Sequence, residues 1–368
     1  MLRRIDFRVL PIILVLMVIS LAVLSATTVQ WGDGGHLLTP LVKAQIQWFA
    51  LGWICFFCFS AIDYRKLRSW SWILYGVVLL LLVGLFFSPA VQNVHRWYRL
   101  GPIAFQPSEY AKLVVVFALS VFLESQGKKA RTWRSTLYAL LIVFVPFVLI
   151  LKQPDLGTAL VLFPIALVMY YFGGVKRRVV AVMTGLALSG FALISALFLG
   201  ILPHEELRPL ATKVMKEYQY ERLSPHTYHQ TAAETAIALG GVKGSGWRKS
   251  EFTGRQWLPA AHTDSVFPAF AEEFGLIGVV FLLGVFFGLV TLSFQVAAVA
   301  PDPFGRFLAA GIAVYLAMHI LVNLGMMCGF LPITGVPLVL ISYGGSSILA
   351  TMMALGILQS IYSRRFMF

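Results

Sequence analysis

Residues 274–294 read FGLIGVVFLLGVFFGLVTLSF, a run of 21 residues without a charged side chain. A helix needs about 20 predominantly apolar residues to cross the hydrocarbon core of a bilayer, so this run is long enough for one crossing. The whole chain has the same character, because 59% of its 368 residues are hydrophobic and only 12% are charged. Its mean hydropathy is +0.81. Soluble domains carry about 25% charged residues. The sequence therefore predicts an integral membrane protein.

Outward from that run, the same length criterion predicts an all-α protein with ten transmembrane helices. The predicted spans are residues 9–29, 45–62, 70–88, 108–124, 136–152, 157–174, 179–202, 267–297, 304–329 and 344–362. We expect residues 1–368 to form a single polytopic membrane domain. The first apolar run resembles a signal peptide, but it is too long for one and further spans follow, so it predicts an uncleaved helix.

Short basic loops predict the orientation, because Lys and Arg are enriched on the cytoplasmic side of membrane proteins. With ten spans, five basic clusters fall on one side, at residues 3–8, 65–68, 128–134, 176–178 and 364–365. Both termini are therefore expected in the cytoplasm, and residues 203–265 are expected to form a large extracytoplasmic loop between the seventh and eighth helices. The same clusters explain the net charge of +13 without a nucleic-acid partner.

The large loop ends in Leu258-Pro259-Ala260-Ala261-His262-Thr263-Asp264-Ser265, directly before the eighth predicted helix. Asp264 is therefore expected about where the chain re-enters the bilayer. An ionisable group at such a depth is costly, so the aspartate is a functional candidate.

A second polar cluster begins at Arg96 and continues into the fourth predicted helix. Glu109 and Lys112 are three residues apart, so they share a helix face and can pair. The pair could lock the helix, or Lys112 and Arg96 could hold an anionic ligand, and the sequence leaves both open. Asp155 follows a proline and could cap the sixth helix or pair with a cation of this cluster.

Three further patterns have structural explanations. The glycines within residues 240–246 predict tight turns or close backbone approach, because the strand and helix start of a nucleotide-binding loop are missing. His226 and His229 have zinc-like spacing but lack Cys or carboxylate partners at matching positions. The uncharged Gly/Pro-rich segment 329–337 is expected to be buried in protein or to line a cavity.

Five motifs, in this order, resemble the SEDS family (shape, elongation, division and sporulation proteins), and most closely its rod-shape branch. They are Arg96-Trp97 with Phe105-Gln106-Pro107-Ser108-Glu109 and Lys112, Gln153-Pro154-Asp155-Leu156-Gly157-Thr158, Leu258-Pro259 with His262-Thr263-Asp264, Ala271-Glu272-Glu273-Phe274-Gly275, and Gly335-Val336-Pro337 with Ser342-Tyr343-Gly344-Gly345-Ser346. The resemblance covers essentially the whole chain. It implies a peptidoglycan glycosyltransferase that polymerises lipid II at the outer face of the bacterial cytoplasmic membrane. It also implies a class B penicillin-binding protein, a transpeptidase of the elongation machinery, as partner.

The resemblance assigns individual residues as well. The family's catalytic aspartate corresponds to Asp264, and its functionally sensitive Glu and Lys of the fourth helix correspond to Glu109 and Lys112. The chain departs from the family pattern at Ala232, Ala260, Ala261 and Ser265, where other residues are usual. These departures bear on substrate contacts and partner fit, while the acid itself is kept.

From these residues we expect one inverting sugar transfer with Asp264 as general base on the acceptor hydroxyl. The expected cations on the leaving diphosphate are Arg96, Lys112 and Arg222. The other predicted substrate-binding residues are Glu109, Asp155, His262, Thr263, Glu273 and Ser342. The sequence requires no cofactor and leaves a divalent cation open. The competing hypotheses are a flippase for lipid-linked precursors, a division-type SEDS protein and a non-catalytic scaffold.

Overall fold

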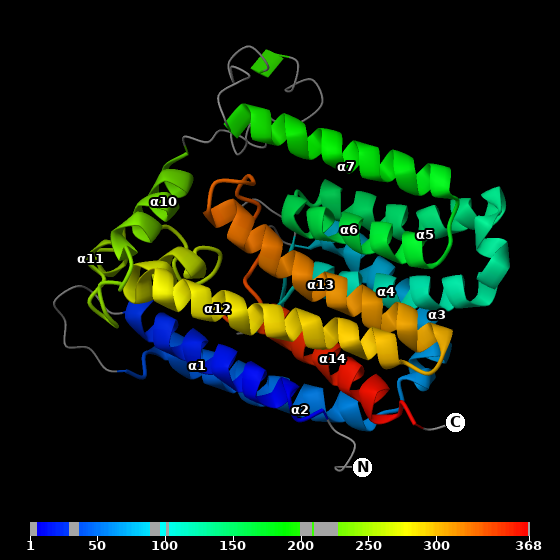
Figure 1. Ribbon diagram of the computed structural model, residues 1–368, viewed down its shortest axis with the longest axis horizontal. Helices are drawn as coiled ribbons and strands as arrows, with labels where there is room; N and C mark the ends of the chain where they lie inside the picture. The colour runs from blue at the N-terminus through cyan, green and yellow to red at the C-terminus, as the bar shows by residue number, and fades with distance from the viewer. Residues whose placement is uncertain are drawn as a thin grey trace.

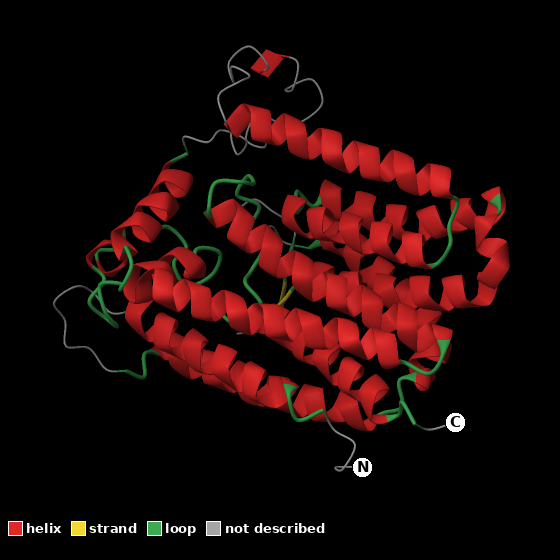
Figure 2. Ribbon diagram, in the orientation of Figure 1, coloured by secondary structure: helices red, strands yellow, loops and turns green. Residues whose placement is uncertain are grey.

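The computed structural model describes residues 6–28, 37–88, 96–100, 103–198, 208–209 and 227–366. These residues form an almost entirely helical bundle in which the long helices run roughly side by side (Figures 1 and 2). In chain order the helices are α1 (Val9–Thr27), α2 (Pro40–Ala61), α3 (Arg65–Gly84), α4 (Pro107–Gln126), α5 (Trp133–Lys152), α6 (Leu156–Phe172), α7 (Arg177–Phe198), α10 (Tyr228–Gly240), α11 (Glu251–Gly254), α12 (Val266–Val299), α13 (Pro303–Met327) and α14 (Gly345–Ser363). A hairpin of two short antiparallel strands, β1 (Tyr98–Leu100) and β2 (Ile103–Phe105), precedes α4.

Each predicted span overlaps a helix of the described residues, although the bounds differ. Nine helices in the described part of the chain are long and apolar enough to cross a membrane, and α6 is a shorter apolar helix of 17 residues. The predicted starts of the second and third spans were five residues late. α2 begins at Pro40, after Thr39 caps it, and α3 takes in the basic residues from Arg65. Basic side chains in a first turn can extend to water, so they need not lie outside the helix.

The centre of the bundle is formed by α4, α13 and α14, most of whose residues are buried. Within it, α13 packs on α4, α6 and α12, and α14 packs on α2. By contrast, α7 lies at the edge of the bundle, and nearly all of its residues are exposed or half-buried (Figure 1). Buried polar residues on the central helices therefore face protein rather than lipid.

The described part of the predicted large loop contains two helices, α10 and α11, that were not predicted from the sequence. α10 begins after Thr227, whose side chain accepts a hydrogen bond from the Gln230 N–H, and it lies with α11 at one end of the bundle (Figure 1). The polar, alanine-rich composition of α10 gave no membrane-span signal.

The glycines that follow α10 bring the loop against the start of α12. A Cβ on Gly240 would overlap the carbonyl of Ala271, and a Cβ on Gly244 would overlap that of Glu273. Opposite them, Gly275 breaks α12 with φ 62° and ψ −166°, a conformation that favours glycine. The predicted close backbone approach is confirmed, and it fixes the segment that leads to Asp264.

Candidate active site

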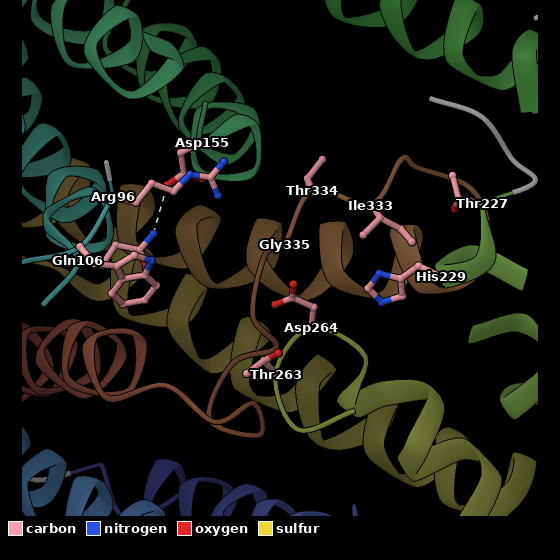
Figure 3. A pocket seen from close by; sticks show the side chains of 11 residues that line it. Arg96, Gln106, Asp155, Thr227, His229, Thr263, Asp264, Ile333, Thr334 and Gly335 are labelled. Carbon is pink, nitrogen blue, oxygen red and sulfur yellow. Dashed lines mark hydrogen bonds between the residues drawn. The ribbon is translucent and has the colours of Figure 1, made fainter. Parts of the chain in front are cut away.

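A cavity of about 470 Å³ is lined by segments that lie far apart in the sequence (Figure 3). Its lining residues are Arg96, Trp97, Gln106, Asp155, Thr227, His229, Thr263, Asp264, Ile333, Thr334 and Gly335. The cavity brings together four predicted site residues from three separate motifs: Arg96, Asp155, Thr263 and Asp264. The uncharged segment 329–337, expected to be buried in protein or to line a cavity, contributes Ile333, Thr334 and Gly335 to the lining.

Asp264 lies on the loop just before α12, between the two ends of the cavity (Figure 3). The Asn323 side chain on α13 donates from Nδ2 to the backbone oxygens of Asp264, at 3.0 Å, and of Val336, at 2.7 Å. A Cβ built on Gly335 would lie 3.3 Å from Asp264 Oδ2, and Gly335 has φ 77°. The carboxylate therefore sits against a backbone segment that has no side chain to crowd it.

Ser342 holds the backbone of the His-Thr-Asp motif without lining the cavity itself. Its hydroxyl donates to the Thr263 carbonyl at 2.6 Å and accepts from the Leu338 N–H at 2.8 Å. One residue later, the Tyr343 N–H donates to the His262 carbonyl at 2.9 Å. His262 is exposed, with its ring against that of Tyr343. These bonds fix the loop that carries Asp264 to the start of α14.

Asp155 is the N-cap of α6, which confirms the first of the two roles predicted for it. Its Oδ1 accepts from the Thr158 N–H at 3.3 Å, and its Oδ2 accepts from the Thr158 hydroxyl at 3.0 Å. The same Oδ2 accepts from Ser108 Oγ at 2.9 Å and from Gln106 Nε2 at 3.2 Å. Asp155 thus joins the first turns of α4 and α6 at the cavity wall.

Arg96 enters the cavity just before β1. Its Nε donates to the Gln153 carbonyl at 3.1 Å, and Gln153 is in turn held by its Nε2 donating to Leu82 O at 2.7 Å. These contacts place a permanent positive charge on the wall that also carries Asp155 (Figure 3).

Glu109 and Lys112 form a buried ion pair on α4, outside the residues that line the cavity. The Lys112 Nζ lies 2.8 Å from Glu109 Oε1 and 2.7 Å from His319 Nε2 on α13, and all three residues are at most 3% exposed. His319 Nδ1 lies 3.4 Å from the Pro337 carbonyl. The ion pair is therefore connected to the segment that holds Gly335 beside Asp264.

Glu273 and its neighbour Glu272 are fully buried at the start of α12, again outside the cavity lining. The Glu273 carboxylate accepts from the Arg248 N–H and from Ser250 Oγ. Glu272 accepts from the N–H groups of Phe252 and Thr253 in the first turn of α11. Both glutamates fasten the loop to α12.

Two other predictions concern Arg222 and metal ions. Arg222 lies outside the described residues. Within the described ranges, no group of three or more His, Cys, Asp and Glu side chains could hold a metal ion.

Comparison with known proteins shows the family of this chain. The model of the FtsW, RodA and SpoVE family, described as "Cell cycle protein", matches residues 5–365. This chain belongs to the SEDS family. It is 32% identical to the peptidoglycan glycosyltransferase MrdB of Escherichia coli over 363 residues, which cover 96% of this chain and 93% of MrdB.

Solved structures support the same assignment. The rod shape determining protein RodA of Thermus thermophilus superposes with a TM-score of 0.72 at 29% identity, covering 99% of this chain and 98% of that one. A chain from a study of how a peptidoglycan synthase complex coordinates polymerization and crosslinking matches with a TM-score of 0.75 at 29% identity, with 99% of both chains covered.

Three residues of this site were not predicted from the sequence. His229, Asn323 and His319 each contact a motif from a distant part of the chain. His229 was weighed only as a zinc ligand. His319 and Asn323 are polar residues four apart in an apolar span, which places them on one helix face, and this spacing was the available signal.

Proposed function

We propose that this protein is a peptidoglycan glycosyltransferase that polymerises lipid II into glycan strands for cell elongation. It acts at the outer face of the bacterial cytoplasmic membrane. The observation that carries the proposal is the cavity in which the Asp264 carboxylate lies with the cationic side chain of Arg96. The named glycosyltransferase and rod-shape relatives, similar over nearly the whole chain, support it.

The reaction is one displacement at the anomeric carbon of the donor sugar. The acceptor hydroxyl oxygen bonds to that carbon, while the bond from the carbon to the diphosphate oxygen breaks and its electron pair leaves with the diphosphate. The hydroxyl proton passes to the Asp264 carboxylate. An α-linked diphosphate thereby gives a β-1,4 glycosidic bond. A positioned general base contributes about 10²–10⁴-fold to such a step.

Arg96 stabilises the negative charge that develops on the leaving diphosphate. A guanidinium presents a planar fork of N–H donors that matches phosphate oxygens. The Gln153 carbonyl holds the Arg96 guanidinium in place, so this side chain needs little reorganisation during the reaction. Preorganised charge of this kind is an effective source of catalysis. Asp155, Thr263 and the exposed His262 complete the proposed substrate contacts.

Glu109 and Lys112 act indirectly. Lys112 bonds to His319, which contacts the Pro337 carbonyl, two residues from Gly335. We therefore assign the ion pair the role of setting the wall against which Asp264 lies. Ser342 sets the Thr263 backbone in a similar way. Arg222 remains a proposed diphosphate contact on sequence grounds alone.

The proposed topology has ten crossings with both termini in the cytoplasm. It is supported by the nine span-length helices among the described residues. The 17-residue α6 would be the tenth crossing, at the short end of the usual range of roughly 17 to 25 residues. The proposed orientation rests on the basic clusters of the sequence, because Lys and Arg are enriched on the cytoplasmic side of membrane proteins.

A class B penicillin-binding protein is the proposed transpeptidase partner, as the match to the peptidoglycan synthase complex supports. The proposed mechanism needs no metal. A divalent cation that took part would be held largely by the substrate diphosphate, as Mg²⁺ often is.

The test is polymerisation of purified lipid II by the purified protein with its partner. We expect Asp264→Asn to fold and to abolish glycan formation. Glu251→Gln is the matched control, because it also removes a carboxylate charge from the loop but at an exposed position on α11. Glycan formation by Asp264→Asn would refute the base assignment. A wild-type protein that moved lipid II across vesicles without making glycan would instead favour the flippase.

A further inference from the structure

The cavity has two chemically different ends. Arg96 and Gln106 lie toward one end, and Thr227 and His229 lie toward the other, with Asp264 between them (Figure 3). The first end also carries Asp155, whose carboxylate oxygens accept hydrogen bonds from Gln106, Ser108 and Thr158. The Arg96 guanidinium is the cation at this end, and a cation suits phosphate oxygens. The other end carries an imidazole and a hydroxyl side chain.

His229 is held by a residue next to the proposed base. Its Nε2 lies 2.7 Å from the hydroxyl of Ser265, the residue after Asp264. Ser265 is fully buried, and its N–H donates to the Ala260 carbonyl at 3.1 Å. Ser265 directly precedes α12, and its carbonyl accepts from the Ala269 N–H in the first turn of that helix. The hydroxyl thus occupies a fixed position, which sets the orientation of the His229 ring.

The start of α10 is fixed as well. Thr227 caps the helix, and the hydroxyl of Tyr228 donates to the Trp257 carbonyl at 2.8 Å. His229 therefore lies on a short helix tied at its first turn to the loop that carries Asp264. A ring fixed from both sides loses little conformational entropy when it binds a ligand.

The chemistry of the imidazole suits a sugar better than a diphosphate. Because Nε2 is hydrogen-bonded to Ser265, a ligand would meet the other ring nitrogen, Nδ1, which donates or accepts according to the tautomer. A sugar hydroxyl can match either role, because it both donates and accepts. Diphosphate oxygens only accept, and they are matched by the guanidinium at the other end.

We propose that His229 binds the sugar of the lipid-linked substrate and that Ser265 is the positioning residue that orients its ring. This inference rests on the proposed function, because it takes lipid II as the ligand. It assigns the sugar to the end of the cavity lined by Thr227 and His229, and the diphosphate to the end lined by Arg96.

The test measures binding without turnover, in an Asp264→Asn background. The probes are lipid II and undecaprenyl diphosphate, which has the same lipid and diphosphate but no sugar. We expect His229→Ala to weaken lipid II binding roughly tenfold, the order of a lost hydrogen bond, and to leave undecaprenyl diphosphate binding unchanged. Arg96→Ala should weaken the binding of both probes.

A double-mutant cycle tests the positioning role. Ser265→Ala should weaken lipid II binding severalfold when His229 is present and have no further effect in His229→Ala, because Ser265 acts through the imidazole. Ser125→Ala, which removes an exposed hydroxyl at the far end of α4, is the matched control. His229→Asn replaces His229→Ala if the alanine variant unfolds.

The sugar assignment would be overturned if His229→Ala weakened the binding of both probes equally, or if it left lipid II binding unchanged. Additive effects of the Ser265 and His229 substitutions would overturn the positioning role. Neither result depends on glycan synthesis, so failure of the inference is distinct from failure of the proposed function, which the polymerisation assay reports.

Discussion

The Asn323 side chain on α13 donates a 3.0 Å hydrogen bond to the backbone carbonyl of Asp264. The same Nδ2 donates to Val336, so one buried amide joins the loop before α12 to the segment before α14. The position of the proposed base therefore depends on a helix that contributes no side chain to the cavity lining.

We expect Asn323→Leu to lower the free energy of unfolding by about 2–4 kcal/mol, because two buried carbonyls lose their donor. Glycan synthesis should fall at least tenfold even when the protein is folded. Thermal unfolding in detergent and the polymerisation assay measure the two effects. Gln359→Leu is the control, since Gln359 is a buried amide on α14 whose Nε2 has no partner within the described structure. Equal activity of the two variants would contradict the role of Asn323.

Gly335→Ala should reduce activity by crowding the Asp264 carboxylate. Gly174 provides a matched comparison, because its φ of 71° is close to the 77° of Gly335 but a Cβ there would meet nothing within 4 Å. Both substitutions should cost about 1–2 kcal/mol of stability from left-handed backbone strain. Only Gly335→Ala should slow polymerisation. Similar activities of the two variants would exclude crowding as a factor.

Lys112→Met should destabilise the protein by about 3–5 kcal/mol, because it leaves Glu109 buried without its cation. The double substitution Glu109→Leu with Lys112→Met should recover much of that stability, since no buried charge is then left over. We expect the double variant to remain inactive if the pair sets the cavity wall through His319. An active double variant would show that the ion pair only stabilises the fold and does not set the cavity wall.

Glu273→Ala should make the loop that precedes α12 more mobile without weakening substrate binding. Hydrogen exchange of the backbone amides of residues 245–254 should accelerate, because the Arg248 N–H and the Ser250 hydroxyl lose their acceptor. Lipid II affinity in the Asp264→Asn background should stay the same. Glu251→Ala on the exposed face of α11 serves as the control. If Glu273→Ala lowered the affinity for lipid II without accelerating hydrogen exchange, Glu273 would be a substrate contact after all.

The sequence by itself determined the class of fold and singled out Asp264 as the proposed base. Runs such as residues 274–294 must be helices in a membrane, because a backbone in lipid has no water to bond with. Asp264 could be singled out for a related reason. An ionised carboxylate at the edge of a bilayer costs free energy, so a chain that keeps one there has a functional use for it.

Tertiary structure decided which candidates meet. Arg96, Asp155 and Asp264 line one cavity, while Lys112 and Glu273 are held elsewhere by bonds to His319 and to the loop. Helical periodicity says which residues share a face of one helix, but not which helices pack together or how a loop folds back on them. The contacts of His229, His319 and Asn323 join residues 13 to 207 positions apart, and only the packing of the bundle brings such residues within hydrogen-bonding distance.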